Sequence, residues 1–228
     1  MNTETIKCPR LFNYFCNVEC RGNYPADLIE MLALDAKKAR RFDKGDHIAY
    51  QGDAIEDLML LTKGSVRMEI ISDVGYNLFV SEHRAPFPLG ASLLFSSKNR
   101  FAHDVIALEE CMVEYYDTKG VEKAMTYCPH FRRGFLHYSS DQVQNLSQRL
   151  QIFSIKKIRS KLAFYILEQT DKNGLFDLGM SVTSLAEYFG VTRSALSRVI
   201  TELVDLGAIE YDKGIGRVLD RKILSSQI

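Results

Sequence analysis

The alternation of apolar and polar positions divides the chain into regions with different periods. Residues 42–118 consist of short β-rich runs separated by glycines roughly 7 to 15 residues apart, which is typical of an all-β barrel or sandwich. The run 57–61 is apolar enough for a strand buried on both faces. Further on, Val66, Met68 and Ile70 alternate with Arg67, Glu69 and Ile71. Residues 87–95 are too interrupted by Pro and Gly to form a long strand.

The residues before this β region are predicted to begin irregularly and to continue as a helix. Residues 1–24 show no clear period. A helix is expected from Pro25, which suits a first-turn position, and its apolar positions recur at helical spacing. They are Leu28, Ile29, Leu32 and Ala36. Four cations at residues 37–41 follow, as is favourable at the end of a helix.

After Pro129 the pattern is helical for about 25 residues and carries two apolar stripes. The first is a heptad seam whose members are Leu136, Ser139, Val143, Leu146, Leu150 and Phe153. The second comprises Phe131, Phe135 and Tyr138. One stripe would pack on the β region. No earlier helix is long enough to match the other, so we expect the same helix of a second subunit to cover it in a parallel two-fold dimer. Packing of both stripes inside one subunit is the alternative.

Residues 155–228 form a separate small unit, with a helix at 158–170, two short helices and a hairpin at 209–219. Ser181 is expected to cap the first short helix, Gly190 to supply the turn, and Thr192 to cap the second. The buried faces would contain Leu185, Ala186 and Phe189, and then Leu196, Val199, Ile200 and Leu203. This arrangement is a helix-turn-helix.

The exposed face of the second short helix carries cations and hydroxyls but no acid before Glu202. Its members are Arg193, Ser194, Ser197, Arg198 and Thr201. Phosphates and guanine edges accept from such side chains, so this face predicts DNA binding. Lys213 and Arg217 of the hairpin are expected to touch phosphate as a wing. A plain surface helix hairpin is the alternative.

Composition narrows the class of protein further. The chain has 228 residues, 46% hydrophobic and 25% charged, with a formal net charge of zero, which excludes a disordered, collagen-like or disulfide-scaffold chain. No run approaches the ~18 apolar residues of a membrane helix, and the N-terminus has no secretory pattern, so we expect a cytoplasmic protein without membrane contact. A Gly-rich phosphate loop and a His-Glu metal motif are both absent from the sequence, so an enzyme is not expected.

The ordered set of motifs resembles the Crp/Fnr-type transcription regulators. The resemblance covers about Arg40 to Leu219 and rests on the turns at 44–46, 51–53 and 60–66, on Leu162-Ala163 with Ile166-Leu167, and on the helix-turn-helix. It implies an α+β fold with an N-terminal cyclic-nucleotide-binding-like β-barrel, a long dimerisation helix and a C-terminal winged helix-turn-helix. The expected domains are 1–128, 129–154 and 155–228.

The resemblance also implies a function. The protein would be an effector-responsive homodimer that binds double-stranded DNA at a two-fold inverted repeat and contacts RNA polymerase. Arg198 matches the family's guanine-reading Arg, whereas Ser194 stands where the family has Glu. The rival hypothesis is a cyclic-nucleotide-type signalling module whose C-terminal unit binds protein.

Departures from the family pattern bear on the effector. In cyclic-nucleotide-binding members, a Gly-Glu pair and a later Arg-Ser/Thr pair hold ribose and phosphate. Here Gly90 is followed by Ala91, the Arg position falls on Phe101, and Arg100 is one place off, which argues against cyclic AMP. The expected effector pocket comprises Gly90, Ala91, Ser92, Arg100, Phe101 and Ala102, with Leu146 and Ser147 of the long helix.

Two cofactors remain as alternatives to a small-molecule effector. An iron–sulfur cluster needs four thiolates, and the candidates are Cys8, Cys16, Cys20 and Cys111, although their spacing is looser than the family pattern and favours free thiols. Haem is suggested by residues 93–99, which with the helix downstream resemble the HcpR-type nitrosative-stress regulators. His103 and His137 are its candidate ligands.

Overall fold

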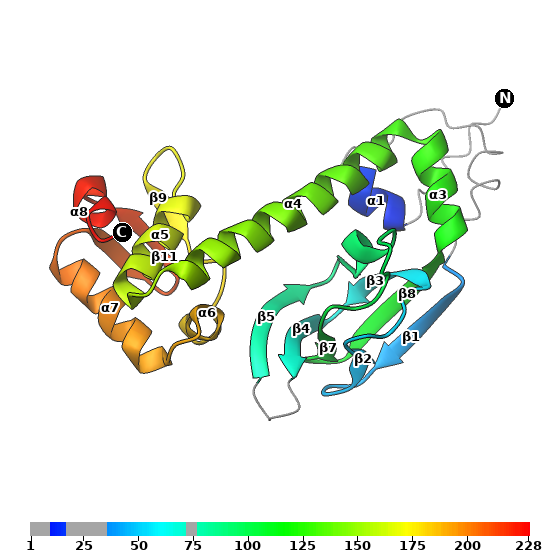
Figure 1. Ribbon diagram of the computed structural model, residues 1–228, viewed down its shortest axis with the longest axis horizontal. Helices are drawn as coiled ribbons and strands as arrows, with labels where there is room; N and C mark the ends of the chain where they lie inside the picture. Colours follow the sequence, from blue (N-terminus) through cyan, green and yellow to red (C-terminus); the bar gives the residue numbers. More distant parts are fainter. Residues whose placement is uncertain (1–9, 17–35, 72–76) are drawn as a thin grey trace. The chain divides into compact units, whose positions relative to one another are not determined.

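The computed structural model describes residues 10–16, 36–71 and 77–228 (Figure 1). The chain forms two compact units, residues 1–143 and 144–228. Helix α4 (Pro129–Ser154) begins in the first unit and ends in the second. Its bounds agree with the long helix predicted after Pro129. The division into domains at residues 128 and 154 stays a prediction.

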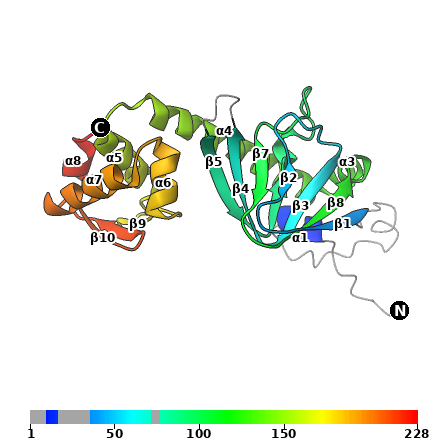
Figure 2. The same ribbon diagram turned by 90° about the horizontal axis from the view of Figure 1, so that it is seen from below.

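The first unit contains two four-stranded antiparallel sheets, in the orders β1-β8-β3-β6 and β2-β7-β4-β5 (Figure 2). Their strands are β1 (Lys38–Phe42), β2 (His47–Ala49), β3 (Asp57–Lys63), β4 (Ser65–Ile71), β5 (Asn77–Arg84), β6 (Phe87–Leu89), β7 (Asp104–Ala107) and β8 (Cys111–Asp117). A short 3-10 helix, η1 (Ala91–Leu93), follows β6, and α3 (Thr118–Tyr127) follows β8. The β region predicted at 42–118 is confirmed, including the broken stretch at 87–95.

Burial along the strands follows the predicted pattern except at one irregularity. Residues 58–61 of β3 are all buried, as expected for a strand covered on both faces. In β4 the alternation holds for Val66 and Met68, but the register shifts between Met68 and Glu69. The extra residue at this shift is Val80 of the partner strand β5, because Met68 pairs with Ser81 and Glu69 pairs with Phe79. Glu69 is buried and Ile70 is only half-buried, so the predicted inward position of Ile70 is wrong.

Two predictions for the start of the chain are also corrected. Residues 10–16, expected to be irregular, form helix α1 (Arg10–Cys16). The cations at 37–41, expected at a helix end, lie mostly on β1, which pairs with β8 and has no second neighbour among the described strands. Lysine and arginine suit such an edge because their charge discourages further strand pairing. The expected helix at 25–35 lies outside the described residues.

Helix α1 packs on the first half of α4 through aromatic rings. Leu11 and Phe15 are buried, and the ring centroid of Phe15 lies 5.3 Å from that of Phe131 and 5.1 Å from that of Phe135. A Cβ atom at Gly134 would lie 1.6 Å from the carbonyl oxygen of Phe15. Only glycine therefore allows the backbone of α1 to approach α4 this closely. Phe131 and Phe135 join the core of the β unit, which confirms the predicted second stripe.

The heptad seam of α4 lies largely exposed in the single chain. The exposed fractions are 55% for Leu136, 65% for Val143, 60% for Leu146, 63% for Leu150 and 40% for Phe153. Ser139 is half-buried, and its hydroxyl donates to the carbonyl oxygen of Phe135 at 3.0 Å. Five large apolar side chains on one line of a helix are an unusual feature of a monomer surface.

The second unit surrounds its own apolar core. Its elements are α5 (Ile158–Gln169), β9 (Leu175–Asp177), α6 (Val182–Phe189), α7 (Arg193–Asp205), β10 (Ile209–Asp212), β11 (Ile215–Val218) and α8 (Arg221–Ser225). The predicted helices and hairpin are confirmed. The sheet has the order β10-β11-β9, and its third strand β9 and the closing helix α8 were not predicted.

The close approach at Gly134 predicts a reversal of the usual effect of removing glycine from a helix. Gly→Ala inside a helix normally stabilises by about 0.5–1 kcal/mol. Here the new Cβ would collide with backbone, so we expect Gly134→Ala to destabilise the protein by ~2 kcal/mol or more in urea unfolding. Ser140→Ala, at an exposed position of the same helix, is the control and should change stability little. A stabilised Gly134→Ala protein would show that α1 does not pack as described.

Candidate nucleic-acid interface

The two short helices of the second unit are positioned by side-chain caps and one left-handed glycine. The Ser181 hydroxyl accepts from the backbone N–H of Ser184 at 3.0 Å, and the Thr192 hydroxyl accepts from that of Ala195 at 3.3 Å. Gly190 has φ +70°, which costs glycine little, and turns the chain between α6 and α7. Both predicted caps and the predicted turn are confirmed.

The inner faces of these helices hold them in the unit. Leu185, Ala186 and Phe189 of α6 are buried, as are Leu196, Ile200 and Leu203 of α7. Val199 is half-buried and packs against the same core. Burial of these positions orients the opposite face of α7 toward solvent.

The solvent face of α7 is the predicted set of cations and hydroxyls. Arg193, Ser194, Ser197, Arg198 and Thr201 are all exposed. Neither guanidinium has a carboxylate partner among the described residues. The first acid of the helix, Glu202, instead forms an ion pair with Arg159 of α5. The face therefore presents uncompensated positive charge, and the N-terminus of α7 adds partial positive charge at its start.

The hairpin beside α7 has the geometry of a tight two-residue turn. Lys213 has φ 47° and Gly214 has φ 100°, and Asp212 pairs with Ile215 across the turn. Two positive φ values in succession match the twist of the flanking strands. The side chain of Lys213 is exposed at the tip.

The base of the hairpin is seated on β9. A Cβ atom at Gly216 would lie 2.4 Å from the ring of Phe176, so glycine permits this contact. Arg217 is exposed and close to Asp171. The pKa of Asp171 is lowered mainly because its carboxylate accepts from the backbone N–H of Leu175, with a smaller contribution from the positive charge of Arg217. Part of the charge of Arg217 is thus balanced within the unit, whereas Lys213 forms no ion pair within the described residues.

A cationic cluster that the sequence did not predict joins the end of α4 to α6. The guanidinium of Arg149 lies 4.8 Å from the ring centroid of Tyr188 and 5.4 Å from that of Phe153. Lys161 is buried and donates to the carbonyl oxygen of Phe189 at 2.9 Å, which satisfies a carbonyl at the end of α6. Burial lowers the pKa of Lys161. The only sequence signal was a lysine among the apolar positions of α5.

The expected effector residues of the first unit form a closed, largely apolar corner. Gly90 has φ +70°, and a Cβ there would lie 3.0 Å from the Phe101 ring and 3.1 Å from Ile55. Phe101 and Ala91 are buried, whereas Ser92 and Ala102 are exposed. The Arg100 guanidinium donates to the carbonyl oxygen of Gly52 at 2.7 Å and so holds a loop.

The remaining residues of the expected effector pocket lie elsewhere in the chain. Leu146 and Ser147 belong to the second unit, whereas the residues around Gly90 belong to the first. The pocket as predicted therefore draws on both units, and its assembly stays a prediction.

The candidate metal ligands are dispersed over the described chain. Cys16 is buried on α1, and Cys111 is buried on β8, where its thiol donates to the carbonyl oxygen of Ser65 at 3.2 Å. Burial raises the pKa of Cys111, which disfavours the thiolate that a metal needs. Cys8 and Cys20 lie outside the described residues. Within residues 10–16, 36–71 and 77–228, His, Cys, Asp and Glu side chains form no group of three that could hold a metal ion.

The two candidate haem ligands differ in their surroundings. His137 is exposed, with its Nδ1 atom 3.4 Å from the carboxylate of Asp141. His103 is half-buried and close enough to His83 to contribute to lowering the pKa of that ring. Among the described residues, neither histidine belongs to a group of three potential metal ligands.

Comparison with known proteins matches each of the two units to a known domain family. The cyclic nucleotide-binding domain profile matches residues 39–127, and the Crp-like helix-turn-helix domain profile matches residues 160–226. The transcriptional activator protein FnrA of Stutzerimonas stutzeri is 22% identical over 200 residues, covering 84% of this chain and 81% of that protein. No described helix is both long and apolar enough to cross a membrane.

Solved structures with the same fold are similarly distant in sequence. A mutant of CooA from Carboxydothermus hydrogenoformans has a TM-score of 0.64 and 17% identity, covering 90% of this chain and 91% of that chain. FixK2 from Bradyrhizobium japonicum has a TM-score of 0.60 and 18% identity, covering 85% of this chain and 98% of that chain. Both therefore share the fold over most of this chain.

The environment of His83 predicts acid sensitivity of the first unit. Burial and the nearby His103 lower the pKa of His83 to about 4, from an ordinary value of 6.5. The unfolded chain then binds more protons between these values, so stability is lost as the pH falls from 6.5 toward 4, by about 3 kcal/mol in all. His83→Gln should remove much of this slope in urea unfolding at a series of pH values. His130→Gln, at an exposed site on α4, should retain it. An unchanged slope in His83→Gln would contradict the assignment.

Proposed function

This chain belongs to the Crp/Fnr-type DNA-binding transcription regulators, and from that premise we propose that it binds an inverted-repeat DNA site as a homodimer. The observation that carries the proposal is the solvent face of α7, where two guanidiniums and three hydroxyls are exposed and neither guanidinium forms an ion pair among the described residues. Such a face suits the major groove, which offers guanine acceptors flanked by phosphates.

Within this interface we assign different roles to the two arginines of α7. Arg193 is the first residue of the helix, beside the cap Thr192, and is suited to a phosphate contact. Arg198 lies further along the same face and is suited to a guanine edge, because its planar guanidinium can donate two parallel hydrogen bonds. Ser194, Ser197 and Thr201 are shorter and contribute hydroxyl contacts. Ser181 positions α6, and Lys213 and Arg217 contact phosphate from the hairpin.

The dimer interface is proposed to be the exposed seam of α4. A second copy of the same helix would cover Leu136, Val143, Leu146, Leu150 and Phe153 and would remove large apolar surface from water. Two-fold symmetry then presents two copies of α7 to two half-sites, which accounts for an inverted repeat. As a regulator of transcription, the dimer would act in the cytoplasm and contact RNA polymerase.

The effector is proposed to be a small molecule other than cyclic AMP. Phe101 and Ile55 occupy the space beside Gly90, and Arg100 is engaged with the backbone of Gly52. This corner offers no guanidinium to a cyclic phosphate. Within the described residues, His, Cys, Asp and Glu side chains form no group of three that could hold a metal ion. The proposed function uses neither a cluster nor haem and requires no enzymatic chemistry.

The rival proposal is that the C-terminal unit binds protein rather than DNA. A protein partner would not require counterion release, whereas DNA binding weakens steeply as salt rises. The two guanidiniums and three hydroxyls of the α7 face favour DNA, because phosphates and base edges accept from such groups. The salt dependence of duplex binding separates the two proposals.

Substitution of the two arginines should separate base readout from phosphate binding. Arg198→Ala should lose ~1–3 kcal/mol of discrimination at one guanine per half-site. Arg193→Ala should weaken binding to all sequences about equally and reduce the salt slope by about one. Selection from random DNA followed by fluorescence anisotropy measures both effects. Lys119→Ala, which removes an exposed cation of the first unit, is the matched control.

The same selection tests the symmetry of the site. Half-sites should lie about 10–11 base pairs apart, centre to centre, because the two recognition helices enter successive major grooves. Recovery of no inverted repeat would contradict the proposed dimeric regulator. Full sequence preference in Arg198→Ala would contradict the assigned readout.

The seam makes its own prediction for the oligomeric state. Val143→Asp combined with Leu146→Asp places four carboxylates at the centre of the two-fold interface, where uncompensated buried charge costs several kcal/mol. Sedimentation should show a dimer for the parent protein and a monomer for the double variant. His137→Asp, outside the seam on the same helix, should remain a dimer. If the parent protein is a monomer at micromolar concentration, the proposal that the seam forms a dimer interface is wrong.

A further inference from the structure

The last turns of α4 are attached to the helix-turn-helix by a cluster of cations and aromatic rings. The guanidinium of Arg149 lies over the rings of Tyr188 and Phe153. The ammonium group of Lys161 lies 5.5 Å from the ring centroid of Phe153. We call these four residues the α4–α6 joint. All four belong to the second unit, residues 144–228.

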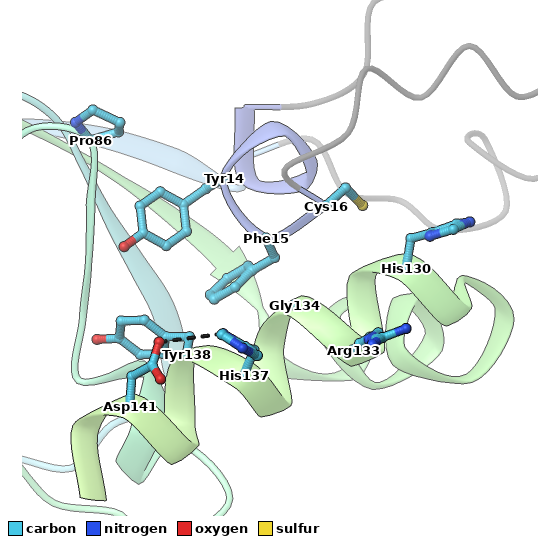
Figure 3. Close-up of a pocket in the computed structure, with 10 residues that line it drawn as sticks. All are labelled: Tyr14, Phe15, Cys16, Pro86, His130, Arg133, Gly134, His137, Tyr138 and Asp141. Carbon is cyan, nitrogen blue, oxygen red and sulfur yellow. Dashed lines mark ion pairs between the residues drawn. The ribbon is translucent and has the colours of Figure 1, made fainter. Parts of the chain in front are cut away.

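The start of α4 is held in the first unit by contacts of a different kind. There Phe15 of α1 packs on the helix at Gly134, and the paired side chains of His137 and Asp141 lie further along the helix (Figure 3). The α4–α6 joint instead places a cation over aromatic rings. Arg149 is not part of the apolar core of the second unit, so a substitution there opens no cavity in that core.

The contact at Arg149 is strengthened because its guanidinium is partly removed from water. Arg149 and Tyr188 are both half-buried. Burial lowers the pKa of Arg149, and the positive charge of Arg149 opposes the rise that burial gives to the pKa of Tyr188. A cation over an aromatic ring is bound more strongly when it is desolvated. The planar guanidinium also stacks on a ring face, which makes the contact directional.

Arg149 supplies a second point of attachment between α4 and the rest of the second unit. Ile152 is buried in the core of that unit and supplies the first. A helix held at one residue can rock about it, whereas a second contact nearly one turn earlier restrains that motion. Gln148 adds a hydrogen bond of 3.2 Å to the carboxylate of Glu168 on α5. The α4–α6 joint therefore restrains the angle between α4 and α6.

Phe153 connects the α4–α6 joint with the seam. It is the last residue of the seam and is 40% exposed. A Cβ atom at Gly190 would lie 4.0 Å from its ring, and Gly190 forms the turn between α6 and α7. A second copy of α4 that covers the seam would therefore pack beside the residue that contacts this turn.

From these contacts we propose that Arg149 is a positioning residue, which sets the spacing between the two DNA half-sites by holding α4 against Tyr188. Two recognition helices enter successive major grooves only if they are about one helical turn of DNA apart, ~34 Å. When α4 forms the two-fold interface, this separation depends on the angle at which each second unit leaves the end of α4. A loosened joint leaves each α7 intact but permits a range of separations. The inference rests on the proposed dimeric DNA binding and deepens it.

Duplexes that differ only in spacing test the role of the joint. The probes are the inverted repeat recovered by the selection, the same repeat with one base pair inserted at its centre, and a duplex with one half-site scrambled. In fluorescence anisotropy the parent protein should bind the inserted repeat about tenfold more weakly than the original, because the two half-sites are no longer engaged together. Arg149→Gln and Tyr188→Leu should reduce this penalty to about threefold or less. Both variants should bind the single half-site as the parent protein does.

Matched variants separate positioning from a general loss of charge. Lys156→Gln removes an exposed cation just beyond the end of α4 and should keep the full spacing penalty, whatever its effect on overall affinity. Tyr188→Phe keeps the ring beneath Arg149 and should also keep the penalty. Sedimentation of Arg149→Gln should show the same dimer as the parent protein.

Three results would overturn the positioning role of Arg149. They are a spacing penalty in Arg149→Gln equal to that of the parent protein or of Lys156→Gln, a monomeric Arg149→Gln protein, and an equal loss of affinity for the single half-site and the repeat. The last result would mean that Arg149 only supports the fold of the second unit. A parent protein without any spacing preference would instead refute the proposed dimeric DNA binding, on which the inference rests.

Discussion

The packing of Phe131 and Phe135 against the N-terminal unit determines the orientation of α4, and the other surfaces of this helix depend on that orientation. A helix residue advances about 100° around the axis, so burying one side determines what the other sides present. With Phe131 buried against Phe15, the seam residues Leu136 and Val143 face solvent. Gly134 makes this arrangement possible because a side chain there would displace α1.

The far end of α4 is built into the second unit in a different way. Ile152 is buried in the core of that unit, while Arg149 packs on the rings of Tyr188 and Phe153. Lys161 holds the last carbonyl of α6 from the same region. One continuous helix thus contributes to the core of the first unit at its start and to the core of the second unit at its end.

Charge is distributed within the second unit so that α7 remains free to bind an anion. Glu202 is paired with Arg159 behind the recognition face, and Asp171 takes part of the charge of Arg217. Arg193 and Arg198 are left without carboxylate partners among the described residues. A net charge of zero for the whole chain is therefore compatible with a strongly cationic local surface.

The sequence by itself determined the elements whose signals are local: the caps Ser181 and Thr192, the turn at Gly190, the strands of the barrel and the two stripes of α4. These depend on backbone propensity and on periodicity, which neighbouring residues specify. Only the tertiary structure decided the features that depend on contacts with segments distant in the chain. Residues 38–41 form a strand because their backbone pairs with β8. Residues 10–16 form a helix whose Phe15 is buried against the aromatic surface of α4. The bulge in β5 depends on how this strand pairs with β4, and the Arg149 cluster arises from contacts between segments far apart in the chain. No local pattern encodes either feature.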